Sequence, residues 1–106
     1  MALLDPTKGS EQSGKRPVVI ISRDAINHNS SVVVCVPCTG LENCTKIYPS
    51  QVLFKKGVGM LDKDSVAMCD QVRAITVNRL EKYLGKLDSK SLVDLENAMR
   101  IALDLC

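Results

Sequence analysis

The chain has 106 residues, which is enough for one hydrophobic core, and we expect a single domain over residues 1–106. Hydrophobic residues make up 45% and charged residues 25% of the composition, and this balance excludes an intrinsically disordered chain. The net charge of +2 is too small to require a polyanionic partner. An argument for nucleic-acid binding therefore depends on where individual Arg and Lys residues lie.

Composition also bears on the compartment and on the type of binding surface. No apolar run approaches the roughly 20 residues of a membrane span, and residues 1–5 are too short for a signal peptide. We therefore expect a cytoplasmic protein without membrane contact. The five cysteines are odd in number and are expected to be reduced thiols. Aromatic residues are only 3% of the chain, which argues against stacked aromatic rings as an RNA-binding surface.

Two strands are predicted in the first third of the chain. Residues 4–15 combine Gly, Pro, Ser and charges without an apolar period, which predicts an exposed loop. The β-branched runs at residues 18–21 and 32–36 each predict a central strand buried on both faces. The polar residues between them, 23–31, predict a connection.

Two further strands are predicted in the middle of the chain. Residues 47–54 favour a third strand that is interrupted near Pro49, because proline cannot donate to a sheet. Residues 65–72 alternate well enough for a fourth strand, after a turn at residues 62–64. Short strands joined by turns are typical of a small antiparallel barrel or sandwich.

The period changes to that of a helix near the C-terminus. Ser89 or Ser91 can serve as the N-cap, and a shorter helical turn is predicted at residues 78–84, ended by Gly85. The fold class is therefore α+β, with a terminal amphipathic helix. The apolar residues of that helix recur at spacings of three and four: Leu92, Leu95, Met99 and Ala102.

Two polar residues lie where strands begin or end. Arg16 directly precedes Pro17 at the entry to a buried strand, so its guanidinium is held in place and suits bidentate capture of a phosphate. Thr39 follows the second strand, and its hydroxyl could donate to a phosphoryl oxygen. The alternatives are a solvated strand-end charge for Arg16 and a turn threonine bonded to its own backbone for Thr39.

Histidine and cysteine chemistry is thinly supplied. His28 is the only histidine, which excludes an acid–base pair of two imidazoles. Cys35 and Cys38 have the spacing of a metal or redox pair, with Cys44 as a conceivable third ligand. An offset of three along a strand directs the first two thiols to opposite faces. We therefore expect no metal and no cofactor, and we interpret these cysteines as small buried hydrophobes.

A carboxylate lies near the end of the predicted fourth strand. Alternation places Asp70 on the same face as Val72, so we expect Asp70 to be partly sheltered by the core. A sheltered carboxylate can act as a base or as a structural hydrogen-bond acceptor.

Four segments of the chain resemble the MazF/PemK family of toxins. The first two, residues 4–12 (LDPTKGSEQ) and 14–21 (GKRPVVII), are similar to the N-terminal signature of that family. Residues 36–40 (VPCTG) and 64–75 (DSVAMCDQVRAI) resemble later blocks and occur in the family's order. The resemblance implies an SH3-like β-barrel with a C-terminal helix and a homodimer that binds RNA in a shared groove. It also implies a cognate antitoxin of the MazE type that blocks the groove.

The resemblance also implies a reaction, which is metal-independent cleavage of single-stranded RNA. The ribose 2′-OH attacks the adjacent phosphorus and leaves a 2′,3′-cyclic phosphate and a 5′-OH end. Arg16 matches the family's catalytic arginine and Thr39 its catalytic threonine, with Glu11 and Asp70 as candidates for the base. The loop of residues 8–15 would cover the site. The substrate-binding residues carried over are Ser10, Gln12, Ser13 and Gln71.

The chain departs from the family pattern in three places. Ser10 stands where the PemK branch has a histidine, and Met68 stands where it has an arginine. The family usually has a strand before the Leu-Asp-Pro segment, so we expect a sheet edge to be exposed there. Two alternatives follow: a gyrase-binding toxin of the CcdB type, which relies on a Trp-Gly-Ile ending that this Trp-free chain lacks, and a catalytically silent relative.

Overall fold

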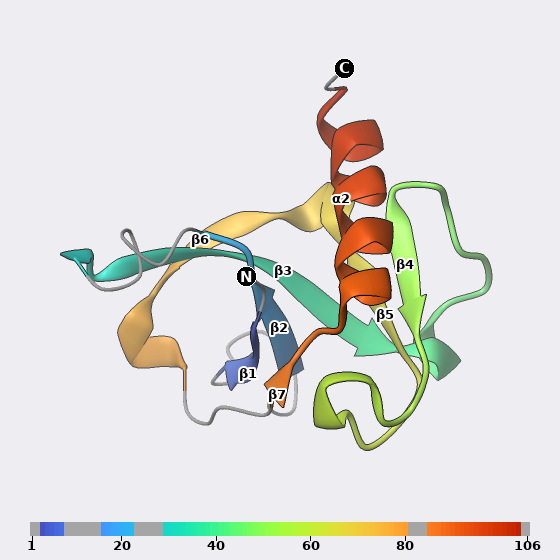
Figure 1. Ribbon diagram of the computed structural model, residues 1–106, viewed down its shortest axis with the longest axis horizontal. Helices are drawn as coiled ribbons and strands as arrows, with labels where there is room; N and C mark the ends of the chain where they lie inside the picture. The colour runs from blue at the N-terminus through green and yellow to red at the C-terminus, as the bar shows by residue number, and fades with distance from the viewer. Residues whose placement is uncertain (1–2, 8–15, 23–28, 81–84, 105–106) are drawn as a thin grey trace.

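The computed structural model describes residues 3–7, 16–22, 29–80 and 85–104. One antiparallel sheet carries the fold, and one helix packs against it near the C-terminus (Figure 1). Short 3₁₀ turns connect several strands: η1 (Leu41–Asn43), η2 (Val58–Met60), η3 (Cys69–Gln71) and η4 (Val77–Arg79). The strands are β1 (Leu3–Thr7), β2 (Arg16–Ile20), β3 (Val32–Gly40), β4 (Gln51–Phe54), β5 (Ser65–Met68), β6 (Arg73–Thr76) and β7 (Gly85–Lys86), and the helix is α2 (Ser89–Leu103).

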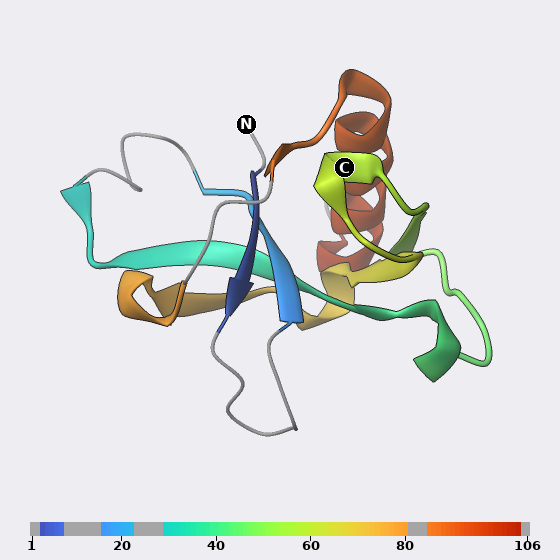
Figure 2. The same cartoon turned by 90° about the horizontal axis from the view of Figure 1, so that it is seen from below.

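Strand β3 is the centre of the sheet. It is nine residues long and begins with a run of valines, residues that favour extended backbone. Its first half pairs with β6, its middle with β2 and its last three residues with β5. The strand order is β4-β5-β3-β2-β1-β7, with β6 as a further partner of β3. Figure 2 shows β3 running across the molecule from the β6 side to η1.

The first strand corrects the loop predicted for residues 4–15. Residues 3–7 form β1, which pairs antiparallel with β2 on one side and with β7 on the other. Pro6 lies opposite Pro17, and neither residue has a backbone N–H to donate to the opposite strand. The Leu-Asp-Pro segment lies in β1 itself, which has a paired strand on each side, so the sheet edge that was expected to be exposed there is paired. Residues 8–15 lie outside the described part of the chain.

The core consists of two groups of buried side chains on the two faces of the sheet. Val18 and Ile20 belong to one group, and Val19 between them belongs to the other. The prediction that the first two strands are buried on both faces is therefore confirmed. The group on the α2 side includes Val19, Val36, Cys38, Val52, Phe54, Leu61, Ala67, Cys69, Leu87, Leu95 and Ala98, and the opposite group is Val18, Ile20, Val33, Cys35 and Ile75.

Helix α2 confirms the predicted terminal helix and corrects its N-cap. Leu95 and Ala98 are buried against the sheet, and the helix contacts β4 and η3. The cap is Asp88, whose carboxylate accepts the backbone N–H of Ser91 at 2.7 Å, rather than Ser89 or Ser91. This bond is the main reason that the pKa of Asp88 is lowered. Within the described residues, no helix is both long and apolar enough to span a membrane.

The α+β class is confirmed, but the strand limits differ from the predicted ones. The strand predicted as the third is β4, which begins at Gln51 after the turn that contains Pro49. The strand predicted as the fourth is β5, which ends at Met68, directly before η3. Gly85 belongs to β7, and residues 81–84 of the predicted helical turn lie outside the described part of the chain. Among the described strands, no pairing joins β4 to β7, so the sheet is not closed into the expected barrel.

The cysteines behave as small apolar residues. Cys35 lies in one core group, whereas Cys38 and Cys69 lie in the other, so the predicted opposite orientation of Cys35 and Cys38 is confirmed. Burial raises the pKa of the Cys38 thiol to about 12 and that of the Cys69 thiol to about 11. Cys44 is only partly buried.

The packing of α2 predicts a large effect of truncation at Leu95, which is 3% exposed. We expect Leu95→Ala to lower the free energy of unfolding by about 2–5 kcal/mol, because it leaves a cavity under the helix. Urea denaturation followed by circular dichroism measures the change. Glu96→Ala, at the adjacent exposed position, is the control and should stay within about 0.5 kcal/mol of wild type. Equal losses in both variants would contradict this packing.

The thiols should differ in reactivity, because alkylation needs both access and the thiolate form. Among the four cysteines that the structure describes, we expect iodoacetamide at pH 8 to modify Cys44 first in the native protein. Cys35, Cys38 and Cys69 should react only after denaturation. Tandem mass spectrometry of digested samples assigns the modified positions. Alkylation of native Cys38 at the rate of Cys44 would show that the core is open on this timescale.

Candidate active site

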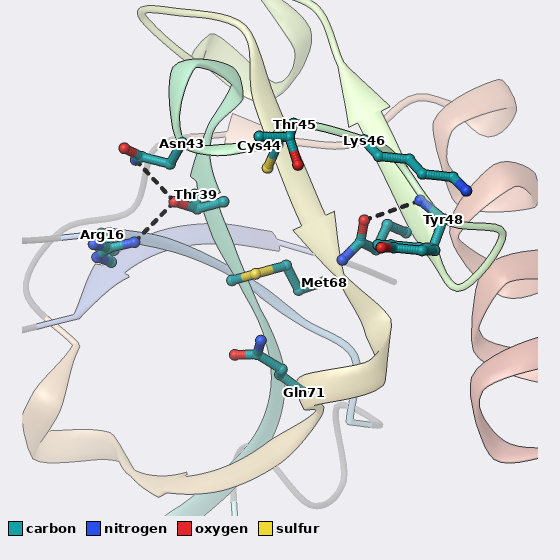
Figure 3. Close-up of a pocket in the computed structure, with 10 residues that line it drawn as sticks. Arg16, Thr39, Asn43, Cys44, Thr45, Lys46, Tyr48, Met68 and Gln71 are labelled. Carbon is teal, nitrogen blue, oxygen red and sulfur yellow. Dashed lines mark hydrogen bonds between the residues drawn. The ribbon is translucent and has the colours of Figure 1, made fainter.

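Arg16 and Thr39 are brought together by the pairing of β2 with β3. Val18 lies opposite Pro37, and continuing this antiparallel register by two residues places Arg16 opposite Thr39. The Arg16 Nη1 atom donates a hydrogen bond of 2.9 Å to Thr39 Oγ1 (Figure 3). Pro17 follows Arg16 and restricts its backbone to extended conformations. The predicted convergence of these two side chains at a strand end is therefore observed.

Thr39 accepts a second hydrogen bond, from Asn43 in η1. The Asn43 Nδ2 atom donates to Thr39 Oγ1 at 3.2 Å. A hydroxyl oxygen has two acceptor sites and one proton to donate, so the two bonds occupy its acceptor capacity. The Thr39 proton is then directed to a different acceptor. Thr39 is 8% exposed and is not a turn threonine bonded to its own backbone.

These residues line a pocket of about 390 Å³, which is in the range of small-ligand sites. Among the described residues, its lining includes two cationic side chains and no acidic one, which favours an anionic ligand such as a phosphodiester. Met68 and Gln71 contribute from the end of β5 and from η3 (Figure 3). The full lining is Arg16, Thr39, Asn43, Cys44, Thr45, Lys46, Tyr48, Gln51, Met68 and Gln71.

One wall of the pocket was not predicted from the sequence. Tyr48 lies there with 51% of its surface exposed, and the Lys46 Nζ atom is 5.2 Å from the centre of its ring. Gln51 accepts the backbone N–H of Tyr48 at 3.1 Å. The low aromatic content argued against such a surface. The local signal that could have revealed it is an aromatic residue two positions after a lysine and next to Pro49, in a polar connection.

The other predicted site residues are distributed differently. Gln71 lines the pocket, as a substrate-binding residue should. Asp70 is exposed in η3 and is not part of the lining, so the predicted partial shelter is wrong. The cause is that the strand ends at Met68, and the turn buries Cys69 instead. Five predicted or discussed residues lie outside the described part of the chain: Ser10, Glu11, Gln12, Ser13 and His28.

The described part of the chain contains no group of three or more His, Cys, Asp or Glu side chains that could hold a metal ion. Cys35 and Cys38 do not form a pair of metal ligands, because their thiols lie in separate core groups on opposite faces of the sheet.

Comparison with known proteins gives a consistent result. The family described as PemK-like, MazF-like toxin of type II toxin-antitoxin systems matches residues 1–103. The endoribonuclease MazF of Staphylococcus saprophyticus is 43% identical over 105 residues, which cover 99% of this chain and 87% of that protein.

Solved structures support the same fold. The Mycobacterium tuberculosis toxin MazF-mt6 superposes with a TM-score of 0.83 over 98% of each chain, at 24% identity. A mycobacterial endoribonuclease, solved in complex with its cognate antitoxin, has a TM-score of 0.81 at 20% identity and covers 98% of this chain and 93% of that one. Together with the match over residues 1–103, these findings show that the chain belongs to the PemK-like, MazF-like toxins of type II toxin–antitoxin systems.

Proposed function

We propose that this chain is an endoribonuclease toxin that cleaves single-stranded RNA, including mRNA, without a metal ion. The observation that carries the proposal is the hydrogen bond between Arg16 and Thr39 in a pocket whose described lining contains two cationic side chains. The 43% identical relative is named an endoribonuclease, which favours cleavage over the gyrase-binding and catalytically silent alternatives. The proposed domain is the whole chain, residues 1–106.

In the proposed reaction the ribose 2′-OH loses its proton and attacks the adjacent phosphorus. The bond from phosphorus to the 5′ oxygen breaks, and that oxygen takes up a proton. The products are a 2′,3′-cyclic phosphate and a 5′-OH end. Negative charge accumulates on the phosphoryl oxygens in the transition state, and a fixed guanidinium stabilises that charge without reorganising. This is the role that we assign to Arg16, because a guanidinium remains charged in proteins.

Thr39 is proposed to donate its hydroxyl proton to a phosphoryl oxygen. Its two acceptor positions are occupied by Arg16 and Asn43, so the proton is left for the substrate. We therefore add Asn43 to the proposed site as a positioning residue. It acts on the substrate through Thr39.

Of the two candidates for the base, we propose Glu11 rather than Asp70. Asp70 does not line the pocket. Glu11 belongs to the segment between β1 and β2, and the residues that flank this segment, Thr7 and Arg16, pair with each other at the pocket. The same segment carries three of the four proposed RNA contacts, Ser10, Gln12 and Ser13. The fourth is Gln71 in η3.

The proposed partners follow from family membership. We propose a homodimer whose shared groove binds RNA, neutralised by a cognate antitoxin of the MazE type. The mycobacterial endoribonuclease with the same fold was solved with its cognate antitoxin, which supports an antitoxin as one partner. Because mRNA is the proposed substrate, we place the protein in the cytoplasm.

The function is tested by incubating the purified chain with a mixed RNA in EDTA and mapping the new 5′ ends. We expect cuts that require a 2′-OH at the cleaved position. Arg16→Ala should lower the cleavage rate by about 10²–10³-fold, as for loss of one transition-state donor. Arg16→Lys should recover only part of the rate, because a lysine lacks the planar fork. Arg100→Ala, an exposed position on α2, is the control for lost charge. Full activity of Arg16→Ala would refute the assignment.

The role of Asn43 predicts that Asn43→Asp reverses the direction of its hydrogen bond with Thr39. The introduced carboxylate accepts the Thr39 proton instead of donating to Thr39 Oγ1, so we expect a larger loss of single-turnover rate than in Asn43→Ala. Loss of one such bond in Asn43→Ala corresponds to about 10-fold. Lowering the pH should restore Asn43→Asp more than Asn43→Ala, because a protonated carboxyl can donate.

Glu42→Gln makes the opposite change, from a carboxylate to an amide, at the preceding residue. Its carboxylate faces Lys63 rather than Thr39, so this variant should keep its rate within about twofold. Rates within twofold of wild type in both Asn43 variants would show that Thr39 does not depend on Asn43.

A further inference from the structure

The structure assigns a second recognition element to the pocket, beside the residues placed at the phosphate. We propose that the ring of Tyr48 is the platform on which one nucleobase next to the scissile phosphate stacks, with Lys46 supplying positive charge at the same position. This inference rests on the proposed function and extends it to the substrate's base.

Tyr48 is held in place by its own backbone. Its N–H donates to Gln51 Oε1 at 3.1 Å, and its carbonyl accepts the backbone N–H of Gln51 at 2.9 Å. Pro49 follows directly and keeps the Tyr48 backbone extended. A ring on a backbone bonded at both its N–H and its carbonyl loses little conformational freedom when a ligand arrives.

The exposure of Tyr48 requires a reason, because aromatic rings in this chain are scarce. Phe54, the other aromatic residue in the described part of the chain, is 2% exposed and belongs to the core. Tyr48 as a whole residue is 51% exposed even with Lys46 over its ring, so a ligand can reach it. Figure 3 shows the ring reaching from the connection after η1 toward Met68, on the opposite side of the pocket from Arg16 and Thr39.

The chemistry of the pocket favours a nucleobase over an apolar side chain of another protein. The phosphate-binding side carries Arg16 and the stacking side carries Lys46, and none of the lining residues that the structure describes is acidic. Every base has a π-face that can stack on an aromatic ring, and the phosphates of the RNA backbone are attracted by the two cations. A backbone phosphate at Arg16 and a base on Tyr48 would therefore engage the two sides of the pocket together.

The test uses the full-length protein and a short RNA that it cleaves, together with the same RNA carrying a 2′-deoxy nucleotide at the cut so that it binds intact. Tyr48→Ala should raise the Kd for the uncleavable RNA by about 5- to 150-fold, the range found for loss of base–aromatic stacking. Tyr48→Phe should bind within about twofold of wild type, because stacking needs the ring. Ile47→Ala is the matched control, since Ile47 is 38% exposed but does not line the pocket.

An abasic scan of the RNA then identifies the stacked base. One abasic position should weaken binding to the wild type and cause no additional loss in Tyr48→Ala. Lys46→Gln should weaken binding and reduce its salt dependence. Circular dichroism shows whether the variants are folded.

The proposal is overturned if Tyr48→Ala binds as tightly as Tyr48→Phe. It is also overturned if every abasic position that weakens binding to the wild type weakens binding to Tyr48→Ala by the same factor. A Tyr48→Ala variant that binds RNA normally and binds only the antitoxin more weakly would overturn it as well. Failure of the wild type to cut any RNA would instead refute the proposed function. The two hypotheses therefore fail in distinguishable ways.

Discussion

The hydrogen bonding of β3 to three other strands is the constraint on which the rest of the structure depends. Its nine residues pair in turn with β6, β2 and β5, and its side chains enter both core groups. A strand fixed in this way cannot shift by one residue, because every side chain would move to the other face. Thr39, at its end, is therefore positioned by backbone pairing and by the valines behind it.

The polar part of the site is built on this rigid frame. Arg16 enters the sheet opposite Thr39, and Asn43 reaches the same oxygen from the 3₁₀ turn that follows β3. Both neighbours donate, so the hydroxyl is oriented before any substrate arrives. Preorganised donors of this kind stabilise developing charge more effectively than groups that must rotate into position.

Sequence reasoning predicted the parts of the fold whose signal is local. The valine and isoleucine runs indicated β2 and β3, and the spacing of Leu92, Leu95, Met99 and Ala102 indicated α2. Strand β1 was missed because Asp5 and Pro6 are typical of a loop, and only pairing with β2 and β7 makes them extended. The cap was assigned to a serine although Asp88 stood one residue earlier, since several good capping residues were adjacent.

The positions of site residues on strands could be predicted from the sequence, whereas those of Asp70 and Tyr48, in a turn and a connection, could not. Arg16 and Thr39 were placed together by the resemblance, and the sheet register explains why they meet. Asp70 was misplaced because alternation was extended through residues that form a 3₁₀ turn. Tyr48 was missed because an overall aromatic content says nothing about where a single ring lies. Its exposure depends on a turn closed by Gln51, which no periodic pattern reports.

Lys46 and Tyr48 lie on residues 44–50, a connection between η1 and β4, whereas Arg16 and Thr39 belong to strands. Connections tolerate insertion and substitution far better than paired strands do. If the two proposals hold, the reaction centre and the stacking ring belong to parts of the chain with unequal freedom to change. Substitutions within these seven residues would then alter how the neighbouring base is held and leave the Arg16–Thr39 hydrogen bond in place.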